Sequence, residues 1–169
     1  MEPVEYTVRE DHLLAFYRLV SRKAFVICST LFGGYAAFLV VLILMGEGSG
    51  VIWGLLIGTL LLIGLIVVAR YILTPRHVRV IYREDKQIQQ TTTLTYDPDG
   101  FTTEFASGRN RREWMNMVKW EENDAIFVIF STRQLGHILP KDQVPENVIG
   151  DLRNHLGASG LLKQGKLRK

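Results

Sequence analysis

Residues 24–73 read AFVICSTLFGGYAAFLVVLILM (24–45), GEGSG (46–50) and VIWGLLIGTLLLIGLIVVARYIL (51–73), and this stretch decides the fold. The first run contains no charged residue, and the second contains only Arg70, near its end. About 20 helical residues span roughly 30 Å, the thickness of the hydrocarbon core of a bilayer. The two runs are therefore predicted to form a transmembrane helical hairpin, with helices at 24–45 and 51–73.

A pair of buried helices in a soluble protein is the alternative interpretation of these runs. An amphipathic helix of a soluble domain keeps a polar stripe for solvent, and neither run has one. The chain has 169 residues, too few to bury two helices that are apolar on every side. We therefore expect an integral membrane protein.

Positive charges flank the hairpin and are missing from its loop. Those before it are Arg9, Arg18, Arg22 and Lys23, and those at or after its end are Arg70, Arg76, Arg79, Arg83 and Lys86. The loop itself carries only Glu47. By the positive-inside rule, both termini are expected in the cytoplasm and the glycine-rich loop on the opposite side.

The remaining composition excludes several classes of protein. The single cysteine, Cys28, lies in the first run, so the chain has no internal disulfide framework. The formal net charge is +3, and the charges are unevenly distributed. A basic tail at 158–169 carries Lys163, Lys166, Arg168 and Lys169 and no acidic residue. We expect a solvated end, with attraction to an anionic membrane surface as the alternative. No aromatic residues alternate with these cations, so nucleic acid is not an expected partner.

The segments on either side of the hairpin are predicted to be amphipathic. Residues 1–23 should hold a strand at Val4–Val8 and a helix that Asp11 caps and that continues into the first span. The apolar side of this helix either lies in the membrane interface or packs on the soluble domain. After the second span, Pro75 is expected to interrupt the helix, and 74–90 should form a basic juxtamembrane helix.

Residues 91–157 change to short segments of alternating polarity. They predict a small antiparallel sheet capped by a C-terminal helix, which makes the soluble part an α+β domain. Strands are expected at 92–96, 101–105, around Trp114, around Trp120, at 125–130 and at 136–139, with turns at 97–100, 107–110 and 121–124. Pro145 opens the final helix, whose apolar side is Val148, Ile149, Leu152 and Leu156.

Small residues recur within the two spans. The candidate helix-packing residues are Gly33, Ala37, Gly54 and Gly58. The last two have the four-residue spacing that lets helix backbones approach closely. We expect them to serve packing between the protein's own two helices, and a homo-oligomer formed through the remaining face is the alternative.

Several segments together resemble a known family. In chain order they are Leu94–Asp97, Asp99–Gly100, Trp114, Val118, Ile126–Phe130 and Leu139–Lys141. With the hairpin before them, they resemble the YcxB-like family of bacterial membrane proteins over nearly the whole chain. The resemblance implies a bacterial cytoplasmic (inner) membrane protein with a pleckstrin-homology-type barrel, in which Trp114 and Val118 are core residues. It implies no enzymatic activity, ligand or cofactor, so no catalytic residue is carried over.

The residues themselves also favour binding over catalysis. The four histidines lie in different elements without metal-ligand spacing, so no metal, cofactor or catalytic residue is expected. Glu121, Glu122 and Asp124 are interpreted as a solvated turn. The expected function is a protein-interaction or scaffolding module, with a protein partner or a second copy docking at an open sheet edge.

Binding of anionic lipid headgroups is the alternative function. Arg109, Arg111 and Arg112 are the candidate contact residues, because arginines on one turn can hold a phosphate through forked hydrogen bonds. A solvated turn that binds nothing is the competing interpretation.

Overall fold

The computed structural model describes residues 3–46 and 48–161, and the chain divides into two compact units. Residues up to Leu19 together with those from Val78 onward form a sheet-and-helix unit. Residues Val20–His77 form a helical unit. The basic tail predicted at 158–169 lies outside the described residues from 162 onward.

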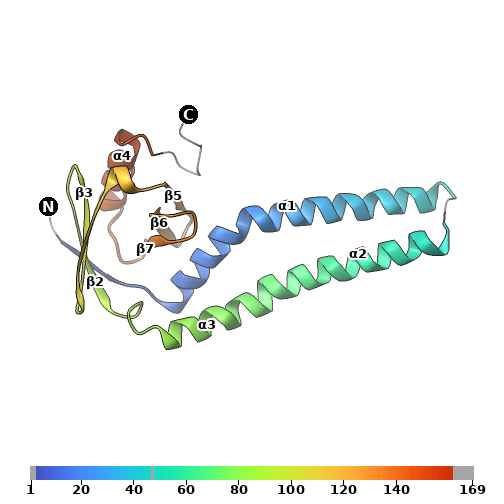
Figure 1. The fold of residues 1–169 in the computed structure, drawn as a ribbon, viewed down its shortest axis with the longest axis horizontal. Helices are drawn as coiled ribbons and strands as arrows, with labels where there is room; N and C mark the ends of the chain where they lie inside the picture. Colours follow the sequence, from blue (N-terminus) through green and yellow to red (C-terminus); the bar gives the residue numbers. More distant parts are fainter. Residues whose placement is uncertain (1–2, 47, 162–169) are drawn as a thin grey trace. The chain divides into compact units, whose positions relative to one another are not determined.

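Two long apolar helices form the hairpin, as the sequence predicts (Figure 1). They are α1 (Glu10–Leu44) and α2 (Gly50–Val68), joined by a turn in which Gly46 takes a positive φ of 91°. The Ser49 hydroxyl accepts a hydrogen bond from the amide of Ile52 and caps α2. Few side chains are buried between the helices, namely Ala36, Leu39, Leu56 and Thr59, so most of the apolar surface of both is exposed.

Pro75 does not interrupt the second helix, contrary to the expectation. The chain remains helical through α2, a π-helical turn at Ala69–Leu73 and α3 (Thr74–Glu84). In a regular α-helix the proline ring clashes with the carbonyl group one turn earlier. The π turn widens the helix just before the ring, and the Ala69 carbonyl oxygen accepts hydrogen bonds from both the amide and the hydroxyl of Thr74.

The ends of the helices also differ from the expected positions. Helix α3 ends at Glu84 instead of near residue 90, because the Asp85 carboxylate accepts the Gln87 amide and stabilises a local turn. Helix α1 begins at Glu10, so Asp11 lies in the first turn and is not the cap. Instead, the His12 side chain reaches back and its Nδ1 accepts the Arg9 amide, 3.2 Å away.

A four-stranded antiparallel sheet has the order β1-β2-β3-β4. Its strands are β1 (Val4–Thr7), β2 (Thr91–Tyr96), β3 (Gly100–Phe105) and β4 (Gly108–Glu113). Strand β1 pairs with β2 in a register that places Tyr6 opposite Thr92. The strand before the hairpin is therefore an integral part of the sheet that follows it.

A three-stranded sheet and one helix complete this unit. The sheet has the order β5-β6-β7, with β5 (Lys119–Glu122), β6 (Ile126–Phe130) and β7 (Gly136–Pro140), and it is followed by α4 (Glu146–Ala158). The antiparallel sheet domain with a C-terminal helix is thus confirmed. Trp114, however, lies in a short 3₁₀ turn (Trp114–Asn116) and not in a strand.

The main core lies between the sheets and α4. Its fully buried side chains come from all three layers and include Leu94, Phe127, Leu139, Ile149, Leu152 and Leu156. Burying one such side chain contributes roughly 1.5–3 kcal/mol. Trp114 is also buried, and its indole N–H donates to the Asp97 carbonyl oxygen, so this aromatic side chain is a core residue as expected. Val118, the other expected core residue, is 51% exposed, and its side chain lies outside this core.

The start of α1 packs on the sheet domain. Phe16 stacks on Phe130 of β6 with ring centroids 5.9 Å apart, and the Lys119 ammonium lies over the same Phe130 ring. Leu13 and Leu19 are buried as well. Of the two alternatives for this amphipathic segment, packing on the soluble domain is the one observed for residues 10–19.

Gly100 provides a test of the β3–β4 pairing. A Cβ atom at this position would lie 2.2 Å from the Arg112 carbonyl oxygen, so Gly100→Ala should disturb the ladder and destabilise the domain by about 1–3 kcal/mol or more. Gly150→Ala is the control, because open space surrounds that position in α4 and alanine should stabilise the helix by roughly 0.5–1 kcal/mol. Urea unfolding in a Trp53→Phe background, followed by the fluorescence of Trp114 and Trp120, measures both. Equal effects of the two substitutions would contradict this account.

Candidate functional site

The three candidate arginines lie on strand β4 and not on a turn. The turn is confined to Ala106 and Ser107, because β3 pairs with β4 over its whole length, from Gly100 opposite Glu113 to Phe105 opposite Gly108. Alternation along the strand places Arg109 and Arg111 on one face of the sheet and Arg112 on the other. The structure therefore does not gather the three guanidinium groups into one cluster.

Arg109 and Arg111 each lie beside a carboxylate on the outer face of the sheet. The Arg109 Nε atom is 3.1 Å from the Glu104 carboxylate, and Arg111 is 2.9 Å from that of Asp97. Both pairs are exposed, so each contributes little stability. They do neutralise the two charges, and a phosphate would have to displace a carboxylate in order to bind either arginine.

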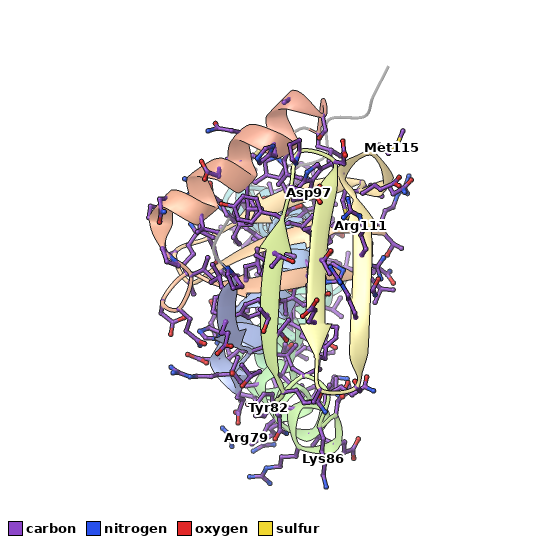
Figure 2. The ribbon with its side chains drawn as sticks, turned by 90° about the vertical axis from the view of Figure 1, so that its left-hand side faces the viewer. Arg79, Tyr82, Lys86, Asp97, Arg111 and Met115 are labelled. Atoms are coloured by element: carbon purple, nitrogen blue, oxygen red, sulfur yellow. The ribbon has the colours of Figure 1, made fainter. Side chains whose placement is uncertain are left out.

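Asp97 is fixed by the turn between β2 and β3. Its carboxylate accepts the amides of Asp99 and Gly100. Desolvation alone would raise the pKa of Asp97, but these hydrogen bonds and the nearby Arg111 guanidinium lower it overall. Asp97 and Arg111 lie near Met115 at one end of the sheet, whereas Arg79, Tyr82 and Lys86 lie at the other (Figure 2). The carboxylate of this turn therefore interacts with the guanidinium group of Arg111 on β4.

Glu121 and Glu122 are not part of a solvated turn, contrary to the expectation. Both lie in β5, and their side chains are only 9% and 12% exposed. Glu121 pairs with Lys119 at 2.6 Å, and Glu122 joins Lys141 of the β7–α4 connection to Arg153 of α4. Hydrogen bonds to Glu122 and Glu146 raise the pKa of Arg153. This ionic cluster attaches α4 to the three-stranded sheet.

The candidate helix-packing residues face away from the contact between α1 and α2. An added Cβ atom at Gly33, Gly54 or Gly58 would meet nothing within 4 Å, and Ala37 is exposed. The buried contact is made instead by Ala36, Leu39 and Leu56, with Ile43 and Ile52 beside them. The buried part of the contact within this hairpin thus does not include the four small residues, and their role in helix packing stays a prediction.

A cavity of about 320 Å³ lies in the sheet-and-helix unit. Its wall is formed by side chains from β1, the first turns of α1, the segment after α3, the near ends of β2 and β3, and β7 with the loop before it. The lining residues include Tyr6, Phe16, Asp85, Thr92, Phe105, Leu135 and His137. The sequence did not reveal this cavity, because its lining comes from three parts of the chain, 6–16, 85–105 and 134–138, that are distant from one another in sequence.

His137 lies in the wall of this cavity, in an environment that shifts its pKa strongly. Its ring meets that of Phe101 edge-on, with centroids 5.1 Å apart, and Arg112 approaches it from β4. Burial, together with the positive charge of Arg112, lowers the pKa of His137 from 6.5 to about 4. The imidazole is therefore neutral at neutral pH. Its place on the inward-facing side of β7 is the signal in the sequence that could have marked it.

No group of three His, Cys, Asp or Glu side chains within residues 3–46 and 48–161 is placed to hold a metal ion. His12 illustrates the alternative use of such a side chain. Its Nε2 atom lies 3.1 Å from the Asp142 carboxylate while its Nδ1 accepts the Arg9 amide, so both ring nitrogens serve the packing of α1 on the domain. This histidine has a structural role.

The lowered pKa of His137 predicts a loss of stability in acid. Below pH 6.5 the unfolded chain binds a proton that the folded chain takes up only near pH 4, so the free energy of unfolding should fall by up to roughly 3 kcal/mol across that interval. His137→Gln should flatten this dependence of the unfolding free energy on pH. The lowered pKa of Asp97 also destabilises the fold in acid, and this smaller dependence remains in both proteins. Urea unfolding at a series of pH values measures the slope, and identical slopes for the two proteins would contradict the assignment.

Comparison with known proteins identifies one segment of the chain. Neither a curated protein nor a solved structure matches the chain. A family model described as YcxB-like protein matches residues 96–156, from the end of β2 to the last turns of α4. This match confirms the resemblance seen in the sequence for that segment. Residues 96–156 are therefore similar to the YcxB-like family, whose function is unknown.

Proposed function

We propose that this chain is an integral protein of the bacterial inner membrane that presents its sheet-and-helix unit to the cytoplasm as a binding module. In this proposal α1 and α2 cross the bilayer, and the module binds a partner and does not catalyse a reaction. The proposal has two parts, anchoring and binding, and different observations support them.

The exposed apolar surface of the hairpin supports the anchoring. Both arms are long enough to span a bilayer, and only 6% of the most apolar window of each is buried. Exposed side chains include Leu31, Phe38, Leu61 and Leu65. Leaving so much contiguous apolar surface in water is unfavourable, whereas lipid covers it without cost. The positive charges at the base of the hairpin favour a cytoplasmic location for both termini.

The arrangement of the sheets supports a pleckstrin-type module. A four-stranded and a three-stranded antiparallel sheet are followed by a C-terminal helix that packs into the core between them. This is the layout expected for the pleckstrin-homology-type barrel. Because a fold alone does not fix a function, the binding mode is inferred from the surfaces of the module.

Strand β4 favours a protein partner over a lipid headgroup. It is the last strand of its sheet and is exposed along nearly its whole length, so a strand from another chain can pair with it. The other edge strand of this sheet, β1, is blocked at Thr7, because the Gln143 side chain exchanges two hydrogen bonds with the Thr7 backbone. The pairing of Arg109 and Arg111 with carboxylates disfavours the headgroup alternative at the predicted residues.

Single-cysteine labelling tests the anchoring. In a Cys28→Ser background, Gly48→Cys in the hairpin loop should react with a membrane-impermeant maleimide only in right-side-out vesicles. Met115→Cys, which is 72% exposed in the domain as methionine, should react only in inside-out vesicles. The inverse labelling would contradict the orientation, and recovery of the protein in the soluble fraction would contradict the anchoring itself.

Charge reversal on β4 tests the binding mode. We expect Arg109→Glu with Arg111→Glu to abolish capture of the protein partner from native membranes in mild detergent, because the new carboxylates would repel those of Glu104 and Asp97 and disturb the docking edge. The number of anionic lipids retained in native mass spectrometry should not change. Arg133→Glu, at an exposed position outside β4, is the matched control and should retain the partner. Loss of anionic lipid together with an unchanged set of partners would favour the headgroup alternative.

A further inference from the structure

The cavity occupies one end of the space between the two sheets. Strand β2 indicates which end this is. Tyr96, at the end of β2, donates its hydroxyl hydrogen to Asp151 of α4, whereas Thr92, near the start of β2, lines the cavity. Helix α4 therefore fills one end of the space, and the other end is left open to the cavity.

The side chains at the two ends of this space differ in size. At the α4 end the inward positions hold large residues, among them Tyr96 and Phe101. At the cavity end they include Thr92, with aromatic rings of Tyr6, Phe16 and Phe105 around it, whereas Val128 and Phe130 already fill the space beside the α-carbon of Gly136. A cavity of about 320 Å³ is at the lower limit of the roughly 300–1,000 Å³ seen for ligand sites, enough for one chain or ring.

The charge of the lining restricts the ligand. None of the described lining residues is a lysine or an arginine, and Asp85 is the acidic one among them. His137 is neutral because its pKa is lowered to about 4, and burial raises the pKa of Tyr6, which keeps its phenol neutral. A phosphate or carboxylate would enter beside Asp85, and Arg112, the cation that approaches His137, is not among the lining residues, so binding an anion there is costly. The lining therefore disfavours anions and favours an uncharged apolar group.

The position of the cavity in the chain indicates where such a group comes from. Phe16 lies shortly before Leu19, where the sheet-and-helix unit gives way to the apolar hairpin, and Asp85 lies shortly after Val78, where the chain returns. Because the hairpin is proposed to be embedded in lipid, the wall of the cavity is close in sequence to both points where the chain meets the bilayer. Uncharged lipid is the apolar molecule available there.

We propose that this cavity binds one hydrocarbon chain of an uncharged lipid. The inference rests on the proposed anchoring of the hairpin in a membrane. The chain would contact the rings of Phe16 and Phe105 and cover Leu135, an apolar side chain that is 67% exposed at the rim. Covering these side chains supplies the hydrophobic contribution to binding, and Asp85 excludes anionic headgroups.

Photo-crosslinking of the full chain in phosphatidylcholine vesicles tests this proposal. The probe is a diacylglycerol that carries a diazirine on one acyl chain, and labelled peptides are identified by mass spectrometry. We expect label on the hairpin helices and also on the peptides that contain Phe105 and 134–138. A phosphatidylglycerol probe with the same chain should label the hairpin equally and the cavity peptides much less.

Substitutions at the cavity sharpen the result. Thr92→Leu fills it and should abolish cavity labelling, whereas Thr93→Leu, which faces the opposite side of β2, should not. Leu135→Lys changes an exposed position, so the fold should tolerate it, and the added cation should increase labelling of the cavity by the phosphatidylglycerol probe.

The outcomes separate this inference from the proposed function. Label on the hairpin without label on the cavity peptides would overturn the lipid site and leave the anchoring intact. Equal labelling of the cavity by both probes, or no effect of Thr92→Leu in a folded protein, would also overturn the site. Absence of label from the hairpin would overturn the anchoring, and the lipid site would fail with it.

Discussion

The pairing of β1 with β2 is the constraint on which the rest of the structure depends. Thr7 and Thr91 are partners in one ladder, yet the entire hairpin lies between them in the sequence. The chain must therefore return to the point from which it departed. Two helical arms of 35 residues each, Glu10–Leu44 and Gly50–Glu84, satisfy this requirement because arms of equal length begin and end at the same level.

Equal arms explain why the helix continues through Pro75. A break at the proline would shorten the second helical arm by the length of α3, so the two arms would no longer be of equal length. The π-helical turn at Ala69–Leu73 accommodates the ring without ending the helix. The final turns of α3 are then joined to the start of α1, because Arg79 pairs with Glu10 at 3.0 Å and the Tyr82 hydroxyl donates to the Val8 carbonyl oxygen. These contacts close the base of the sheet domain.

Local patterns predicted the parts of the fold that local patterns determine. The two apolar runs, the alternation of Thr92, Leu94 and Tyr96, and the helix after Pro145 all appear in the structure near their expected bounds. Strand β4 was missed because its sequence, GRNRRE, has no apolar alternation and becomes a strand only by pairing with β3. Glu122 was placed in a turn because its partners, Lys141 and Arg153, are distant in sequence. Long-range pairing decides both cases.

The difference between local patterns and long-range pairing also explains why the sequence indicated the arginines of β4 and not the cavity. A run of arginines in a sequence indicates a phosphate site only if the fold leaves their charges free, and here the register of β3 and β4 places Glu104 opposite Arg109. A cavity is the reverse case, since no local pattern encodes it. Thr92 is unremarkable in sequence, and the space beside it exists because α4 fills only the other end of the sandwich. The end that α4 leaves open is lined instead by the start of α1 and by the segment after α3, which in the sequence lead into and out of the helical unit.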